Sequence, residues 1–348
     1  MKQERRRVQV SRYVFLTALA AMFLLVSGAA CTHGSGVQIA STDSLPPGDF
    51  KLAYQDKANR GASGFSEQLT IHGRLESGGS LYLRLFITNM AGANGRAELT
   101  GRITDSEGHT DQIRLKQKRG TWRFQSDEFD VQVGANRIQF TQGEAHITLQ
   151  GATFSADLHV TSDLPAFRPT GEGTQFGDGY YYQTTVLFPR GKLEGSLLRR
   201  QDDAESEELD LSGRVFAEHR VGNMAIYDMS HRWIQVRDVG EDQTFVLSAF
   251  QRTERLGGRV HASMFVADDD GIRVYEPTIE LELQDFVPVG KSPYQVPKSL
   301  SFRGANGSVG VVKSDRLVSH KSDLGSLSPL VRRLVSVFMN PWTYRHKT

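Results

Sequence analysis

Glu218 and His219 are the neighbouring residues of this sequence that are best suited to acid–base chemistry. Successive side chains of a strand point to opposite faces, so these two cannot form a close pair with each other on a regular strand. If one of them faces an enclosed lumen, a carboxylic acid with a raised pKa could protonate an alkene there. The alternative is a hydrogen-bonded structural pair or two surface residues, and the sequence favours this second interpretation.

Three more residues of the same stretch are suited to lining an apolar cavity. Tyr182 belongs to a run of three tyrosines that alternate between faces, and Met224 lies in an expected irregular loop. Trp233 lies on an expected strand, and tryptophan is a packing residue far more often than a catalytic one. We therefore predict ligand contacts at Tyr182, Glu218, His219, Met224 and Trp233, and no catalytic residue.

Other kinds of site find little support in the sequence. The ten histidines are scattered without an HxxxH-type pair, and residues 268–271 (DDDG) lack the later ligands of a calcium loop, so we interpret them as a charged hairpin tip. No GxSxG elbow, P-loop or dinucleotide fingerprint is present. The 41 Lys and Arg residues balance 40 Asp and Glu residues, which gives no electrostatic footprint for nucleic acid. We expect neither a metal nor a cofactor nor a nucleic-acid partner.

The elements that must position these residues are short strands. From about residue 50, apolar residues recur with period two, for example over 81–87 and 279–283, and Gly-rich turns separate the runs. This pattern is typical of an all-β antiparallel sandwich or barrel. Two prolines and three glycines interrupt it between residues 164 and 177, so we place an inter-domain linker over 168–178. Glycines 191, 195, 213 and 222 are expected to mark turns, bulges or close backbone approaches.

The C-terminal part carries the one helical pattern. Ser328 and Pro329 are suited to the N-cap and first helical position, and apolar residues then recur at helical spacing until the Asn-Pro pair at 340–341. We predict a short amphipathic helix over 326–340. It is expected to pack on a barrel, and the alternative is a helix on a membrane surface.

The first thirty residues have the composition of an export signal. A basic segment precedes an apolar run, and Gly28, Ala29 and Ala30 lead into Cys31, which is the only cysteine. A lone cysteine in an exported protein cannot form an intramolecular disulfide, so this position favours lipidation. We predict a lipoprotein signal peptide over 1–30 and a flexible tether over 31–49. The alternatives are an ordinary cleaved signal peptide and an uncleaved anchor. The protein would then be bacterial, exported and anchored to a membrane, facing the periplasm or in the outer membrane.

Several of these residues support a family resemblance. The segment over 165–177, the PRGKLEG run over 189–195, and Gly213 followed by His219, Met224 and Trp233 resemble the fungal oxidative-stress survival factors over residues 65–271. The resemblance implies two tandem lipocalin-like antiparallel β-barrels, here over 50–167 and 179–318, and the handling of apolar lipids.

A more distant resemblance is to the carotenoid 1,2-hydratases, which add water to a polyene inside a similar scaffold. Their strand tends to read Asp-His-x-Trp-Gly, and residues 218–222 read Glu-His-Arg-Val-Gly, with Val221 in place of the tryptophan. Together these features predict an envelope lipoprotein that binds or carries an apolar lipid or isoprenoid, and a binding protein is favoured over an enzyme. The alternatives are a hydratase- or cyclase-type enzyme acting on an isoprenoid and a structural envelope protein with filled barrels.

Overall fold

The computed structural model describes residues 51–169, 173–200, 206–290, 295–314, 316–322 and 342–347. The expected signal peptide, Cys31, the tether over 31–49 and the expected helix over 326–340 lie outside the described residues. Among the residues that are described, no helix has both the length and the apolar character needed to cross a bilayer.

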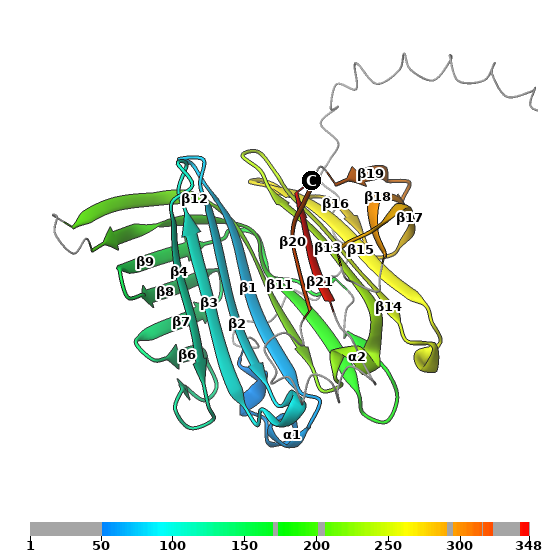
Figure 1. Ribbon diagram of the computed structural model, residues 1–348, viewed down its shortest axis with the longest axis horizontal. Coiled ribbons are helices and arrows are strands. Elements are labelled where there is room, and N and C mark those ends of the chain that lie inside the picture. Colours follow the sequence, from blue (N-terminus) through cyan, green and yellow to red (C-terminus); the bar gives the residue numbers. More distant parts are fainter. Residues whose placement is uncertain are drawn as a thin grey trace, which may run out of the picture. The chain divides into compact units, whose positions relative to one another are not determined.

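Antiparallel strands make up nearly all of the regular secondary structure in the described residues, which confirms the predicted all-β class (Figure 1). The largest sheet, here the first sheet, has twelve strands and curls into a half-barrel. Its path is β4-β3-β2-β1-β12-β11-β9-β8-β7-β6-β5, and β10 pairs with β11 beside it. The strands are β1 (Ser66–Leu75), β2 (Ser80–Thr88), β3 (Arg96–Thr104), β4 (Thr110–Gln117), β5 (Arg123–Phe124), β6 (Phe129–Val133), β7 (Asn136–Thr141), β8 (Glu144–Gln150), β9 (Phe154–Thr161), β10 (Thr174–Gln175), β11 (Tyr181–Arg199) and β12 (Glu207–Gly222).

Three smaller sheets follow along the chain. The second sheet has the order β13-β14-β15-β16, the third β17-β18-β19, and the fourth pairs β20 with β21. Their strands are β13 (Ser230–Val239), β14 (Thr244–Arg252), β15 (Val260–Asp268), β16 (Gly271–Glu276), β17 (Ile279–Pro288), β18 (Gln295–Gly304), β19 (Val309–Lys313), β20 (Arg316–Ser322) and β21 (Trp342–Lys347). The helical segments are short: η1 (Ala53–Gln55), α1 (Lys57–Gly61), η2 (Met90–Gly92), α2 (Ile226–Met229) and η3 (Glu254–Leu256).

The period-two pattern of the sequence becomes the core of the first sheet. On β2, Leu81, Leu83, Leu85 and Ile87 are at most 3% exposed, and the residues between them are partly exposed. The equivalent side chains of β1, β3, β6 to β9, β11 and β12 join them in one apolar cluster on the concave side. Full burial of one such side chain stabilises the fold by about 1.5–3 kcal/mol. Burial of this cluster therefore favours a sheet that curls around it.

Two strands expected in the second barrel complete the first sheet. β12 pairs with β1 from Ser66↔Gly222 to Leu75↔Gly213, and β11 pairs with β9. At Gly213 an added Cβ would lie 2.2 Å from the carbonyl oxygen of Arg74. Here a close approach of two backbones requires glycine, as expected from the sequence. The first sheet thus contains strands from both sides of the linker over 168–178. The sequence did not predict this pairing, because period-two patterning does not specify which strands pair.

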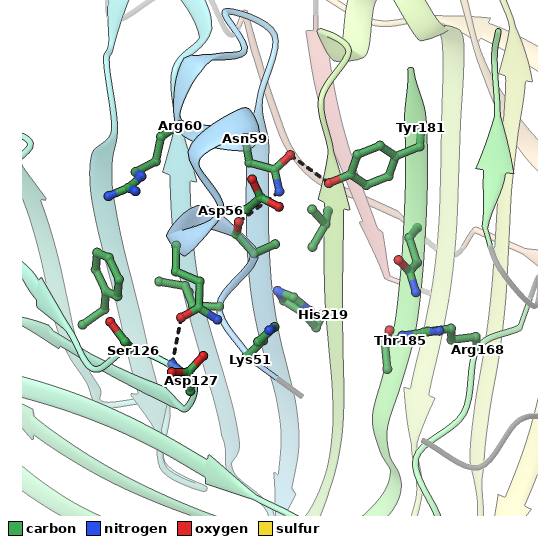
Figure 2. A pocket seen from close by; sticks show the side chains of 16 residues that line it. Lys51, Asp56, Asn59, Arg60, Ser126, Asp127, Arg168, Tyr181, Thr185 and His219 are labelled. Carbon is green, nitrogen blue, oxygen red and sulfur yellow. Dashed lines mark hydrogen bonds between the residues drawn. The ribbon is translucent and has the colours of Figure 1, made fainter. Parts of the chain in front are cut away.

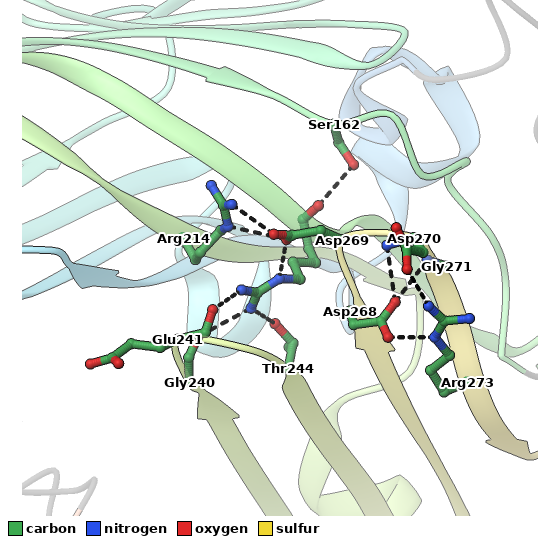
Figure 3. Close-up of polar contacts among 11 residues, drawn as sticks. Ser162, Arg214, Gly240, Glu241, Thr244, Asp268, Asp269, Asp270, Gly271 and Arg273 are labelled. Atoms are coloured by element: carbon green, nitrogen blue, oxygen red, sulfur yellow. Dashed lines mark hydrogen bonds and ion pairs between the residues drawn. The ribbon is translucent and has the colours of Figure 1, made fainter. Parts of the chain in front are cut away.

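A buried arginine joins the first sheet to two turns of the second. Arg190, at an irregularity of β11, has a side chain that is only 1% exposed, and its Nε lies 2.5 Å from the carboxylate of Asp269. It also donates to the carbonyl oxygens of Gly240 and Glu241 at the β13–β14 turn. Arg214 of β12 reaches the same carboxylate at 2.7 Å (Figure 3). These contacts fix the β13–β14 and β15–β16 turns against β11 and β12.

The acidic run over 268–271 is the tip of the β15–β16 hairpin, as predicted. Asp268 accepts backbone N–H bonds from Asp270 and Gly271, and its second oxygen pairs with Arg273 (Figure 3). Asp270 pairs with the same guanidinium at 2.6 Å. The carboxylates of Asp268 and Asp270 are therefore bound by Arg273, and Asp268 is also bound by backbone N–H groups of the turn.

Candidate functional site

Strand β12 presents three consecutive buried polar residues near its end: Glu218, His219 and Arg220 are 2%, 5% and 8% exposed. His219 contacts Glu67 and Phe129 on the concave side of the first sheet. Glu218 instead pairs with an arginine of the second sheet. The prediction that Glu218 and His219 face opposite sides of one strand is therefore confirmed, and each belongs to a different polar cluster.

The first cluster is built around Glu67 of β1. Its carboxylate is 2% exposed and lies 2.7 Å from Nε2 of His219. The same carboxylate accepts the backbone N–H groups of Ala53 at 2.7 Å and Tyr54 at 2.8 Å. Glu67 therefore fixes both the imidazole ring and the η1 segment. A histidine held by a carboxylate in this way keeps one tautomer and one ring orientation.

A cavity of about 540 Å³ lies beside this pair. Its walls come from the η1–α1 segment, the residues after β5, the linker, and strands β11 and β12 (Figure 2). The lining residues are Lys51, Leu52, Ala53, Gln55, Asp56, Asn59, Arg60, Phe124, Ser126, Asp127, Arg168, Tyr181, Gln183, Thr185, His219 and Val221. Pockets that hold drug-sized ligands measure about 300–1,000 Å³, so this cavity is large enough for a small molecule.

Polar groups dominate the lining, and several are held in place. The hydroxyl group of Tyr181 donates to Oδ1 of Asn59 at 3.1 Å (Figure 2). Burial raises the pKa of Tyr181, so its hydroxyl stays protonated at neutral pH. The carboxylate of Asp56 caps α1 by accepting the N–H of Ala58. Leu52, Phe124 and Val221 are among the apolar members of the lining. The cavity thus offers oriented hydrogen-bonding groups beside a smaller apolar surface.

The second cluster lies on the opposite face of β12. The Glu218 carboxylate accepts from Nη2 of Arg220 at 2.8 Å and from Nη2 of Arg237, which belongs to β13. Burial raises the pKa of Glu218, but attraction to the two guanidinium groups outweighs it and the pKa lies below its ordinary value. The alternative in which Glu218 protonates an alkene requires a raised pKa, whereas the two arginines lower the pKa of this carboxyl.

Aromatic side chains border this second cluster. The ring of Trp233 is 5.0 Å from that of Tyr182, with the planes at 76°, and it stacks on Phe250 at 5.4 Å. The guanidinium group of Arg220 lies 5.5 Å from the Trp233 ring centroid. Burial raises the pKa of Tyr182 to about 12. The structure thus brings together Tyr182, Glu218 and Trp233 of the predicted ligand contacts.

The other two predicted contacts lie elsewhere. His219 lines the cavity on the concave face of the first sheet. Met224 is 7% exposed in the segment between β12 and α2, and its backbone lies against Gly64. The five predicted residues therefore do not form one site.

Sequence reasoning missed Glu67, Tyr181 and the two arginines. The sequence pattern did contain one indication for Glu67. It alternates in phase with Leu69 and Ile71, so the pattern predicts that its side chain points into the core. A carboxylate in a core phase needs buried partners. Within the described ranges, no group of three His, Cys, Asp or Glu side chains is arranged to hold a metal ion.

Comparison with known proteins identifies the type of fold. No protein-family model matches the sequence, and no curated protein matches it either. Kievitone hydratase from Nectria haematococca superposes with a TM-score of 0.53 at 15% identity, over 83% of this chain and 86% of that one. CghA with Sch210972 superposes with a TM-score of 0.53 at 12% identity, over 75% of this chain and 79% of that one. The chain therefore shares the lipocalin-like fold of these proteins, whereas the resemblance to the fungal survival factors stays a prediction.

Proposed function

We propose that this protein binds a small amphiphilic molecule, an oxygenated lipid or isoprenoid, in the cavity beside His219. The observation that carries this proposal is the cavity of about 540 Å³ with fixed hydrogen-bonding groups in its wall. The oxygen groups of the ligand would bond to Tyr181, Thr185 or His219. Its apolar part would lie against Leu52, Phe124 and Val221. A fully apolar ligand would leave the polar lining unpaired, which is costly.

We also propose that the protein acts as an exported lipoprotein, anchored to a membrane through Cys31, that carries this ligand. The basic and apolar leader that ends at the only cysteine supports this part of the proposal. The Cys31→Ser variant is expected to leave the membrane fraction or to keep its leader, because the lipid acceptor is gone. Fractionation and mass spectrometry of the mature N-terminus measure this. A normally processed, membrane-bound variant would remove the anchor from the proposal.

Two neighbouring tyrosines provide a matched test of ligand binding. The Tyr181→Phe variant removes the hydroxyl that lines the cavity, and Tyr182→Phe removes the hydroxyl that faces the other cluster. A lost hydrogen bond is worth about 0.5–1.5 kcal/mol, so Tyr181→Phe should weaken binding of a fluorescent polyene alcohol or acid by about 2- to 13-fold. The Tyr182→Phe variant should bind as the wild type does. Equal effects of the two changes, or no saturable binding by the wild type, would contradict the proposed site.

A second candidate function is a hydratase- or cyclase-type enzyme in the same cavity. The buried pair of His219 and Glu67 favours it, because a histidine oriented by a carboxylate is a common general base. A carrier returns its ligand unchanged, whereas a hydratase adds the mass of one water and a cyclase produces an isomer. Mass spectrometry of an isoprenoid alcohol after incubation distinguishes these outcomes. If turnover occurs, His219→Asn should abolish it and leave ligand binding within a few-fold.

A further inference from the structure

The cluster between β12 and β13 holds more positive than negative charge. We call Glu218, Arg220, Trp233, Gln235 and Arg237 the arginine cluster. Hydrogen bonds connect its four polar side chains: one nitrogen of Arg237 donates to both Glu218 and Gln235, and Arg220 donates to Glu218. Trp233 joins through its contact with the Arg220 guanidinium. Glu218 and Arg220 belong to β12, and the other three residues belong to β13. The cluster therefore lies where the convex face of the first sheet meets the second sheet.

Its charges are buried and do not balance. The side chains of Glu218, Arg220 and Arg237 are 2%, 10% and 13% exposed. Over the described ranges, Glu218 is the one carboxylate paired with either arginine. Beyond these three residues, the titratable groups that act most strongly on them are His72, Tyr82 and Tyr182, and no further carboxylate is among these groups. One guanidinium charge is therefore uncompensated, which is costly away from water.

The same cluster contains N–H donors without acceptors. Arg220 Nε, Arg237 Nε, Trp233 Nε1 and Gln235 Nε2 are each shielded from solvent, and none has a hydrogen-bond partner among the residues that the structure describes. Nearly all buried polar groups of native proteins have a partner, so four such donors within one cluster need an explanation. All four are donors, and the local charge is positive. Both features point to an acceptor that carries negative charge.

We infer that the arginine cluster is a binding site for an oxyanion, a carboxylate or phosphate group held by the free N–H donors of Arg220, Trp233, Gln235 and Arg237. Such a group would supply the missing negative charge and several acceptor lone pairs at once. The pKa of Arg237 is lowered, first by burial, as expected for a cation that lacks a full counter-charge. Glu218 and His219 face opposite sides of β12, so this site is separate from the cavity of the proposed function and does not depend on it.

Thermal unfolding with inorganic phosphate, acetate or chloride at equal ionic strength tests the inference. Phosphate or acetate should raise the Tm of the full mature chain by several degrees, saturating in the millimolar range, whereas chloride should not. General salting-out by phosphate does not saturate at such concentrations. The two oxyanions separate the sources: a larger effect of acetate indicates a carboxylate ligand, and a larger effect of phosphate indicates a phosphate ligand. Identical curves in all three salts would overturn the inference.

Two substitutions on one strand locate the site. The Arg237→Met variant leaves Glu218 and Arg220 as a balanced pair, so it should fold and should lose at least 10-fold in apparent oxyanion affinity. Arg232→Met is the control, because this arginine of β13 lies over Phe286 of the third sheet instead. It should respond as the wild type does. Oxyanion-induced change in tryptophan fluorescence, absent in Trp233→Phe, provides a second measurement. A wild-type response in Arg237→Met would place the anion elsewhere and refute the inference.

Discussion

The Glu218→Gln variant is expected to lose about 3–5 kcal/mol of unfolding free energy in chloride buffer at pH 7. The substitution keeps the shape of the side chain but leaves Arg220 and Arg237 buried without any carboxylate partner. Two neighbouring, largely buried cations then repel each other, and little of either side chain is exposed to water. Urea unfolding followed by circular dichroism measures the loss.

A second substitution serves as the control for this prediction. Adding Arg237→Met to Glu218→Gln removes one of the two unpaired cations, so the double variant should be more stable than Glu218→Gln alone. The two effects are coupled because the side chains are in contact. If Glu218→Gln lost less than about 1 kcal/mol, the carboxylate would not be a necessary partner of the arginines.

The pH dependence of unfolding has a defined sign. The folded-state pKa of Glu218 lies below its ordinary value of 4.5, so its pairing contributes stability at pH values above 4.5. That contribution is lost as the pH falls through the folded-state pKa, when the carboxylate becomes protonated. The wild type should therefore lose more stability than Glu218→Gln between neutral pH and pH values below 4.5. Parallel stability curves would contradict the assignment.

The Glu67→Leu variant is expected to lose about 3–5 kcal/mol of unfolding free energy and most of its ligand binding. Its carboxylate accepts from Ala53, Tyr54 and His219, and each buried donor left without a partner costs about 1–3 kcal/mol. The η1 segment would lose its attachment to β1, and this segment forms one wall of the cavity. Urea unfolding and polyene fluorescence measure the two losses.

Matched changes make this prediction specific to Glu67. Glu67→Gln keeps one acceptor oxygen, so its loss of stability should be intermediate. Glu194→Gln, at a side chain that is 60% exposed and paired with Lys192, should change stability by less than about 0.5 kcal/mol. If Glu67→Leu were as stable as Glu194→Gln, Glu67 would not anchor η1.

The strands could be predicted from the sequence because they depend on local patterning. Alternation alone identified the core face of β2 and the opposite orientations of Glu218 and His219. Strand pairing could not be predicted in the same way. The ladder between β1 and β12 joins segments that are distant in the sequence, and many registers would satisfy a period of two.

The candidate site was harder to predict for a related reason. Tyr182, Glu218 and Trp233 were found because they lie in one stretch of the sequence, whereas Glu67 lies far from it, on β1. Arg237 lies on β13 with Trp233, but arginine is mostly an exposed residue, so its type did not predict a buried partner for Glu218. The charge state of Glu218 depends on Arg220 and Arg237 together, and the position of Arg237 depends on how the second sheet packs. A pKa shift of this kind belongs to tertiary structure, so residue types in sequence order do not reveal it.

The ladders of β12 with β1 and of β11 with β9 also set the order in which the chain can fold. The first sheet cannot close until the chain has been made as far as Gly222, which gives it a high contact order and predicts slow folding. Until then, β1 and β9 each keep one edge with unpaired N–H and C=O groups. Such edges are templates for pairing between molecules. A chain that ended at the linker would therefore be expected to self-associate instead of folding as an independent barrel.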